Sequence, residues 1–575
     1  MFGRQTKRSV GAQDSSKTSD NVMLKGGVTY WAKETPSAVA LVNANRTVTY
    51  DELEARATKL AHSLIRMGIK TQDRILLRLP TSIEQIEMTV VAAKIGCLVV
   101  PLDPGTGLDE FASAIREVSP GLVACEDGIW SQLCSKYPEI AEIKSLVVAN
   151  PDRAISSKLA PGICVEYESL IRSVGPGLPD LPSYSGARLG IYNPSIASSQ
   201  ETLKESWPDQ HSVASSQAAQ IKLWMLSSND VYLLSSGSHH PGAGGWAQLC
   251  LYSGASVIIM GEWNPLSWLE MVESNKVSRT FLTPGQITDL VEVSEDIWGK
   301  FDLSSLRSIV HGGTQCAAAL KLRAIERFAP VTLWGIYGES DRLVSRISSN
   351  EWIEHPGSVG KPIAGIAVEI RNEDDKLCSP NVSGGVFWRV AEKEQIEDRG
   401  QDGDKHSRVD KHEQTSLGES SKSSLKLYGG RHIGHLDEDG YLYITDKASE
   451  KIKVGNVSIY PWEVENVIHG HREVLDCVVF KDDARSREPG LIALVVTRSK
   501  NSDTDISEHC RKYLPTFRLP SKIVRVEKLD RDEAGKINRK LYAKRYFDGE
   551  WDENTQIAVP IVTHDGDGEL TQLQV

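Results

Sequence analysis

The sequence predicts an α/β protein, with doubly wound αβα subdomains in a large N-terminal domain and a small α+β domain at the C-terminal end. Short apolar strands alternate with segments of helical apolar spacing over residues 27–127 and again over 230–341. Strand, helix, strand in this order is typical of a largely parallel sheet covered on both faces. The length of 575 residues also exceeds what one core supports, so two or more domains are expected.

The elements of the first stretch follow one another closely. Residues 38–50 (AVALVNANRTVTY) are expected to form a hairpin, and residues 51–68 carry apolar side chains at helical spacing. A buried strand is predicted at 74–80 (RILLRLP), a helix at 82–96 and a further strand at 97–104 (CLVVPLDP). In the second stretch, strands are predicted at 231–236, 254–260, 279–284, 306–313 and 331–340.

The C-terminal third contains a hairpin and then a compact set of elements. Residues 432–447 (HIGHLDEDGYLYITDK) read as strand, acidic turn and strand, with Asp439-Gly440 supplying the positive φ of a two-residue turn. Beyond it, helices are predicted at 461–470 and 506–515, and strands at 474–480 and 491–497. These elements predict the small α+β domain.

Three segments are too polar to bury a core. Residues 1–26 are expected to be a disordered tail, 392–426 a polar insertion and 549–575 an acidic unstructured tail. The remaining chain then divides into a large domain at 27–445, a hinge at 446–450 and a small domain at 451–548.

Composition narrows the class of protein. A formal net charge of −12 argues against nucleic-acid binding, and no apolar run is long enough for a membrane span. Nine cysteines without a paired spacing indicate reduced thiols, which favours a cytoplasmic enzyme over a disulfide framework or zinc site.

Eight segments, in this order, carry a resemblance to a known family. They are TVTYDELEARATKLAHSLIRMGI, GCLVVPLDP, FDLSSLRSIVHGGTQ, WGIYGESD, HPGSVGKPIAG, HLDEDGYLYITDK, SIYPWEVENVIHGHREVLDCVVF and DRDEAGKINRKL. Together they span about residues 30–545 and resemble the adenylate-forming superfamily, which includes acyl-CoA synthetases, adenylation domains of peptide synthetases and luciferases. The resemblance implies a small β-barrel-like subdomain in the large domain and a mobile C-terminal domain. It also implies that ATP, with Mg²⁺, activates a carboxylic acid as an acyl-adenylate, which then passes to the thiol of CoA or of a carrier protein's phosphopantetheine.

Several residues match the family's site by position. Lys536 is the expected catalytic residue, because positive charge is needed where negative charge develops at the α-phosphate. The nucleotide is expected at Gly312, Gly313, Thr314, Tyr337, Gly338 and Ser340, and magnesium at Asp341, since magnesium prefers oxygen ligands. The acid is expected beside His240, Trp334 and Gly335, although His240 could equally be a buried structural histidine.

Two regions depart from the family pattern. The phosphate-binding segment, YNPSIASSQETLKES at 192–206, contains no glycine, so its backbone resists an amide nest, and only Ser198, Ser199, Thr202 and Lys204 offer contacts. At the hairpin, His432 stands where the family has an aspartate for both ribose hydroxyls, and a neutral histidine accepts one hydrogen bond at most. Lys447 stands where the family usually has an arginine, and it keeps the positive charge but lacks the forked guanidinium. Ser449 stands at the family's hinge position.

Two functions therefore remain open. The first is an ATP-dependent carboxylic acid–thiol ligase with weakened nucleotide contacts. The alternative is a catalytically impaired relative that binds an acid or acyl-thioester, or serves as an assembly partner. An acyltransferase that uses no ATP is a third possibility without support in the residues.

Overall fold

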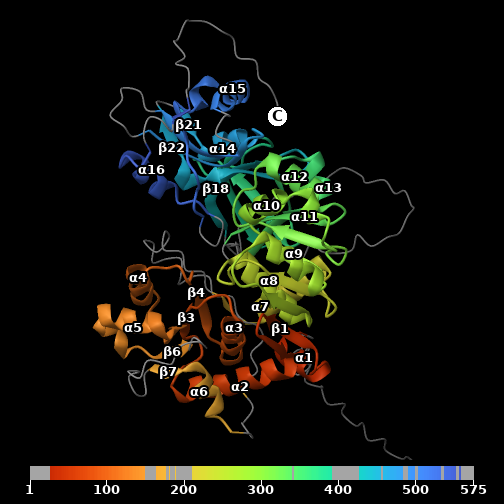
Figure 1. The fold of residues 1–575 in the computed structure, drawn as a ribbon, viewed down its shortest axis with the longest axis vertical. Helices are drawn as coiled ribbons and strands as arrows, with labels where there is room; N and C mark the ends of the chain where they lie inside the picture. The colour runs from red at the N-terminus through yellow and green to blue at the C-terminus, as the bar shows by residue number, and fades with distance from the viewer. Residues whose placement is uncertain are drawn as a thin grey trace, which may run out of the picture. The chain divides into compact units, whose positions relative to one another are not determined.

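Figure 1 shows a computed structural model of the chain, coloured from red at the N-terminus to blue at the C-terminus. The structure describes residues 26–148, 164–175, 181, 188–189, 210–339, 342–390, 427–454, 457–482, 490–498, 503–531, 536–551 and 556–557. The predicted tail at 1–26, apart from Gly26, and the predicted insertion at 392–426 lie outside this part. Its contacts divide the chain into two units, residues 1–231 with 247–259 and residues 232–246 with 260–575.

The first unit is built around a six-stranded sheet whose neighbouring strands are all parallel. In spatial order the strands are β7 (Cys164–Glu166), β6 (Ser145–Val148), β5 (Leu122–Glu126), β3 (Arg74–Arg78), β4 (Leu98–Pro101) and β8 (Arg188–Leu189). Helices α2 (Tyr50–Arg66), α3 (Ile83–Ile95) and α6 (Tyr167–Arg172) contribute to the core on one face, and α4 (Leu108–Val118) and α5 (Asp127–Lys136) to the core on the other.

Alternation along β3 explains why both faces are covered. Ile75 and Leu77 belong to one apolar core and Leu76, between them, belongs to the other. A strand that is apolar at every position buries both sides, which is the pattern of a doubly wound sheet. The predicted hairpin is present as β1 (Val39–Asn43) and β2 (Arg46–Thr49), and β1 pairs in parallel with β10 (Ser256–Ile259). The other elements of this unit are α1 (Val28–Glu34), η1 (Pro138–Glu142) and α7 (Gln210–Trp224).

The second unit begins with four parallel strands. They are β9 (Val231–Leu234), β11 (Arg279–Leu282), β12 (Ser308–His311) and β13 (Thr332–Glu339). The helices along this part of the chain are α8 (Pro241–Ser253), α9 (Pro265–Ser274), α10 (Pro284–Val291), α11 (Glu295–Trp298) and α12 (Ala318–Phe328).

Antiparallel strands continue the sheet from β13 and form the region predicted to be barrel-like. They are β14 (Arg342–Ile347), β15 (Ser358–Pro362), β19 (Leu442–Lys447), β18 (Tyr428–Leu436), β17 (Gly384–Val390) and β16 (Ile366–Arg371), in spatial order, with α13 (Ser349–Glu354) between β14 and β15 in the chain. Trp388, Val386 and Leu442 are buried in the core of this region.

The turn of the predicted hairpin differs from the expectation. The strands β18 and β19 pair as predicted, with Leu436 opposite Leu442, but residues 437–441 form a longer connection in which only Gly440 has positive φ. Asp437 stabilises this longer connection, because its carboxylate accepts the Tyr441 amide at 2.8 Å and its own amide donates to the Tyr441 carbonyl at 3.0 Å. The prediction of a two-residue turn was wrong.

The chain after β19 forms a small α+β layer. A short hairpin of β20 (Ile452–Val454) and β21 (Val457–Ile459) precedes a four-stranded sheet of β22 (Val474–Lys481), β23 (Leu491–Thr497), β24 (Lys522–Arg525) and β25 (Gln556–Ile557). Helices α14 (Pro461–His469) and α15 (Asp503–Tyr513) pack in one core and α16 (Arg539–Phe547) in the other, with η3 (Ala448–Glu450) and η4 (Thr516–Arg518) as short turns. Strand β25 corrects the prediction that residues 549–575 are unstructured throughout, since Ile557 pairs with Ile523.

The described residues contain no helix that is both long and apolar enough to cross a bilayer.

Candidate active site

Two predicted site residues that are far apart in the sequence act on each other. Lys536 is exposed and precedes α16, whereas His240 is buried at the start of α8. Burial is the main cause that lowers the pKa of His240 to about 3, and the charges of Lys536 and His239 contribute to the same shift. The structure therefore brings the predicted catalytic lysine into the neighbourhood of the carboxyl end of β9, where a parallel sheet commonly holds its ligands.

The ring of His240 has a fixed orientation. Its Nδ1 accepts the amides of Gly242 at 3.1 Å and Ala243 at 3.3 Å, and its ring lies 5.4 Å from that of Phe281. A neutral imidazole that accepts at Nδ1 carries its proton at Nε2. His240 is thus a structural cap of α8, and it also presents a fixed N–H donor.

The turn after β12 is shaped for close approach of backbone. A Cβ at Gly312 would lie 2.8 Å from Cγ1 of Ile336, and Gly313 has φ of +86°. At Gly312 there is no room for a side chain, and at Gly313 the positive φ disfavours any residue that carries one. Thr314 follows with a buried hydroxyl that has no hydrogen-bond partner among the described residues. An orphaned hydroxyl beside bare backbone fits a planar, polar ligand such as a nucleobase.

The two residues before Ile336 contact protein groups. Trp334 lies under the guanidinium of Arg346, 4.6 Å from its ring centre. A Cβ at Gly335 would lie 2.7 Å from Nζ of Lys321 and 3.2 Å from Nε2 of His311. The side of β13 at Gly335 is therefore filled by a buried lysine and a buried histidine.

Tyr337, His432 and Lys447 form a chain of neighbours. The Tyr337 hydroxyl lies 3.1 Å from Nδ1 of His432, and the two rings meet edge to face with centres 5.4 Å apart. His432 also lies opposite Lys447 in the β18–β19 ladder. One ring nitrogen of His432 is therefore engaged by Tyr337. Gly338 is adjacent, at a bulge where a Cβ would lie 2.3 Å from the carbonyl oxygen of Arg342.

Six predicted residues lie outside the part of the chain that the structure describes. They are Ser198, Ser199, Thr202 and Lys204 of the phosphate segment, and Ser340 and Asp341 after β13. Within the described ranges, no group of three or more histidine, cysteine, aspartate or glutamate side chains is arranged to hold a metal ion.

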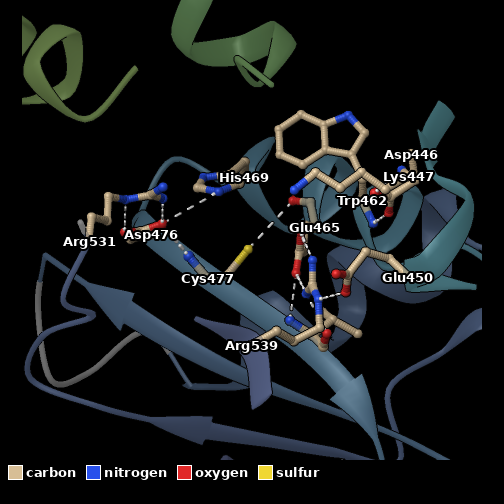
Figure 2. Close-up of polar contacts among 11 residues, drawn as sticks. Asp446, Lys447, Glu450, Trp462, Glu465, His469, Asp476, Cys477, Arg531 and Arg539 are labelled. Carbon is tan, nitrogen blue, oxygen red and sulfur yellow. Dashed lines mark hydrogen bonds and ion pairs between the residues drawn. The ribbon is translucent and has the colours of Figure 1, made fainter. Parts of the chain in front are cut away.

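Figure 2 shows the polar network around the predicted hinge, which contains Ser449 within η3. At the first residue of the predicted hinge, the Asp446 carboxylate accepts the amides of Lys447 at 2.7 Å and Trp462 at 3.0 Å. Burial raises the pKa of Asp446, and these amide bonds oppose the rise. At the last residue of the predicted hinge, the guanidinium of Arg539 donates to the Glu450 carboxylate at 3.0 Å.

Arg539 also reaches into the small α+β layer. Its Nη1 donates to the Glu465 carboxylate and to the carbonyl of Val479 (Figure 2). Glu465 in turn accepts the Val479 amide at 2.7 Å. Arg539 therefore fastens the end of the hinge to α14 and β22.

Residue patterns did not indicate three further contacts. Gln315 donates to the carbonyls of Ile444 and Thr445, Asn466 of α14 accepts the first amide of α12, and Arg498 pairs with Glu292. Each joins segments that are far apart in the chain, and no local spacing signals such a pair.

The fold, a parallel α/β core followed by an antiparallel region and a small α+β layer, matches two family models of AMP-binding enzymes. The model described as AMP-binding enzyme matches residues 28–167 and 210–391, and the model of the AMP-binding enzyme C-terminal domain matches residues 463–536. The chain belongs to the AMP-binding enzyme family.

Individual relatives are distant but match along nearly their whole length. A fatty acid–[acyl-carrier-protein] ligase, ScoC of Streptomyces coeruleorubidus, is 22% identical over 90% of this chain and 95% of its own. An indoleacetate–CoA ligase of Aromatoleum aromaticum is 22% identical over 89% of this chain and 96% of its own. A long-chain-fatty-acid–CoA ligase, FadD13 of Mycobacterium tuberculosis, is 23% identical over 87% and 93%.

Solved structures share the fold. The o-succinylbenzoate CoA synthetase of Bacillus subtilis, in complex with its acyl-adenylate intermediate, superposes with a TM-score of 0.68 at 17% identity and covers 90% of this chain and 97% of its own. ATP-bound MatB of Rhodopseudomonas palustris has a TM-score of 0.71 at 15% identity, over 91% and 99%.

Proposed function

We propose that the protein is an ATP-dependent carboxylic acid–thiol ligase that works through an acyl-adenylate. The observation that carries the proposal is the match of both AMP-binding family models along the chain. The fixed ring of His240 at the end of β9, whose pKa the charge of Lys536 helps to lower, supports a site shared by that end and the C-terminal lysine. The relatives that match over most of the chain are acid–CoA and acid–carrier ligases, which favours the enzyme over the impaired relative.

In the first step an oxygen of the acid's carboxylate bonds to the α-phosphorus of ATP, and the bond from that phosphorus to pyrophosphate breaks. Lys536 stabilises the charge that develops on the α-phosphate oxygens. The fixed Nε2–H of His240 donates beside the acid and keeps it oriented.

In the second step the thiol sulfur bonds to the acyl carbon, the thiol proton passes to solvent and AMP leaves with the bonding electrons. AMP is a far better leaving group than hydroxide, which is the reason for the two-step route.

The nucleotide contacts proposed for this chain are Gly312, Gly313, Thr314, Tyr337, Gly338, His432 and Lys447. The buried, unpartnered hydroxyl of Thr314 and the bare backbone before it fit this role. Ser198, Ser199, Lys204 and Ser340 are proposed phosphate contacts and Asp341 a magnesium ligand, and Mg²⁺ bound there would neutralise phosphate charge. Trp334 and Gly335 remain proposed neighbours of the acid.

Domain boundaries and the thiol complete the proposal. We keep a large domain at 27–445, a hinge at 446–450 with Ser449 as pivot, and a small domain at 451–548. CoA and a carrier protein are both candidate thiol donors, because the relatives include two CoA ligases and the carrier ligase ScoC.

The impaired relative remains the second candidate function, because two observations favour it. The hydrogen bond between the Tyr337 hydroxyl and Nδ1 of His432 occupies one ring nitrogen, and an imidazole cannot supply the two acceptors that two ribose hydroxyls need. The AMP-binding model also leaves residues 168–209 unmatched, and these include the glycine-free phosphate segment.

Exchange of radiolabelled pyrophosphate into ATP, measured across a panel of carboxylic acids, separates the two functions. The ligase requires acid-dependent exchange that is lost in Lys536→Ala and retained in Lys540→Ala, a neighbouring exposed lysine. His432→Asp should raise exchange if the ribose contact limits the wild type. Absence of exchange with every acid, together with no thermal shift on adding ATP, would leave the impaired relative.

A further inference from the structure

Glu292 ends α10 and receives two arginines from different parts of the chain. Arg323 of α12 donates to its Oε1, and Arg498, which follows β23, donates to both carboxylate oxygens, with Nη2 to Oε1 at 2.6 Å. Because Arg498 uses two nitrogens on two oxygens, the pair is a fork, the geometry that gives arginine–carboxylate pairs their directional strength. This ion pair joins the part before the hinge to the part after it.

Each partner is held in place by its own part of the chain. Nε of Arg498 donates to the carbonyl of Arg472 at 2.9 Å, and its backbone amide donates to the carbonyl of Glu473 at 2.9 Å. Glu292 is held by an ion pair with Arg323 of α12. The guanidinium and the carboxylate are thus already oriented before they meet, which lowers the entropy cost of forming the pair.

The charge state of Glu292 suits an ion pair at neutral pH. Burial raises the pKa of its carboxyl, but hydrogen bonds from Arg498 and Arg323 outweigh that effect and leave the pKa below its ordinary value. At the other end of α10, in its first turn, Gly285 also meets the C-terminal part, since a Cβ there would lie 3.5 Å from Cδ of Arg531. Arg531 is fixed by Asp476 of β22 at 3.0 Å. Both ends of α10 therefore contact the C-terminal part.

We propose that Glu292 is a positioning residue, whose ion pair with Arg498 holds the C-terminal part in the orientation that keeps Lys536 beside His240. The inference rests on the proposed ligase function, because it assigns the pair to the first of the two steps. Glu292 touches no reacting atom in this scheme; it acts through Arg498 on the placement of Lys536.

The pair is also built to open. When the C-terminal part moves away, Glu292 keeps Arg323 and Arg498 keeps the carbonyl of Arg472. Neither charge is left buried alone, since the side chains of Arg498 and Glu292 are already 31% and 29% exposed. Exposed pairs of this kind contribute modestly and are screened by salt. Such a contact favours one orientation without preventing the other.

The test uses Glu292→Gln, Arg498→Gln and the double variant in the full chain. Arg545→Gln is the matched control, because Arg545 also makes a fork with a glutamate, Glu550, at 32% and 42% exposure, but within the C-terminal part. Each single variant should slow pyrophosphate exchange by about 3- to 10-fold, the range for a partly exposed fork. The double variant should be no slower than either single one, and the transfer of a preformed acyl-adenylate to thiol should not slow.

A second measurement reads the orientation without catalysis. Cleavage by a lysine-specific protease after Lys447 and Lys451, which flank the hinge and are both exposed, should accelerate in the two single variants and, with added salt, in the wild type. If neither the wild type nor any variant exchanges pyrophosphate, the ligase proposal fails. The cleavage rates then still test whether the Glu292–Arg498 ion pair holds the C-terminal part. The role of Glu292 would be overturned if Glu292→Gln and Arg498→Gln gave the same rates of cleavage and exchange as Arg545→Gln. It would also be overturned if the loss of exchange in the double variant were the product of the two single losses.

Discussion

Arg539→Met should loosen the small α+β layer more than any change at its surface. The side chain of Arg539 is 21% exposed and donates to Glu450, Glu465 and the carbonyl of Val479. Glu465 is only 7% exposed, and without Arg539 it keeps the Val479 amide as its sole partner in this network. Removing one member of a buried ion pair costs about 3 to 5 kcal/mol. Because Arg539 retains some solvent contact, we expect a loss near about 3 kcal/mol.

Native-state hydrogen exchange of the β22 and β23 amides measures this loss directly, since those amides report the opening of the layer. The double variant Arg539→Met/Glu465→Gln should recover more than about 1 kcal/mol, because the amide still serves the Val479 N–H and carries no charge. Lys540→Met, one residue on and exposed, should change stability by less than about 0.5 kcal/mol. A loss below about 1 kcal/mol in Arg539→Met, or a double variant no more stable than the single one, would refute the reasoning.

Three further predictions concern buried positions. The pKa of His240, about 3 in the fold against 6.5 ordinarily, means that the unfolded chain binds more protons between these values. The free energy of unfolding should therefore fall by about 1.4 kcal/mol per pH unit below about pH 6.5. In His240→Asn, the free energy of unfolding measured with urea should depend less on pH, by the equivalent of one proton. Burial lowers the pKa of Lys321 from 10.5 to about 8. Lys321→Met should thus be the more stable form at pH 7, by about 2 to 3 kcal/mol, with an advantage that shrinks between about pH 8 and 10.5 in the same assay. Gly360→Ala should cost at least about 2 kcal/mol in thermal unfolding, because φ is +91° and the new Cβ would lie 1.9 Å from the carbonyl of Arg346. At Gly357, where φ is +85° and nothing lies within 4 Å, the same change should cost only about 1 kcal/mol. Equal losses at the two glycines would contradict the steric argument.

The fold class could be predicted from the sequence because the spacing of apolar residues along each element matches the positions that the structure buries. Strand β3 is apolar on both faces, and the helices that cover it carry apolar residues at helical spacing, so local pattern and packing give one answer. The length of the hairpin connection did not follow, since it depends on a carboxylate of Asp437 reaching the amide of Tyr441. An Asp-Gly pair is compatible with either connection.

The site was predictable only where position in a motif implied it. Lys536 and His240 were both named, yet no spacing between them indicated that the charge of one would reach the other. Lys321 escaped prediction for a different reason: lysine is almost never fully buried, so a helical lysine reads as solvated. Glu292 and Arg498 read as ordinary surface charges until the fold places them together.

The contacts on either side of the hinge limit how the C-terminal part can turn. Asp446 and Lys447 are held in the β18–β19 ladder, and Glu450 is held by Arg539 within the C-terminal part. Only the backbone torsions of Ala448 and Ser449 then lie between two fastened ends. The proposed movement of the C-terminal part is then a rotation about a nearly fixed axis and not an unrestricted reorientation. Each such rotation breaks the hydrogen bond between the Asp446 carboxylate and the Trp462 amide. The helix α14 would lose one acceptor for its N-terminal amides every time the first orientation is left and regain it on return, which links the capping of one helix to each turn.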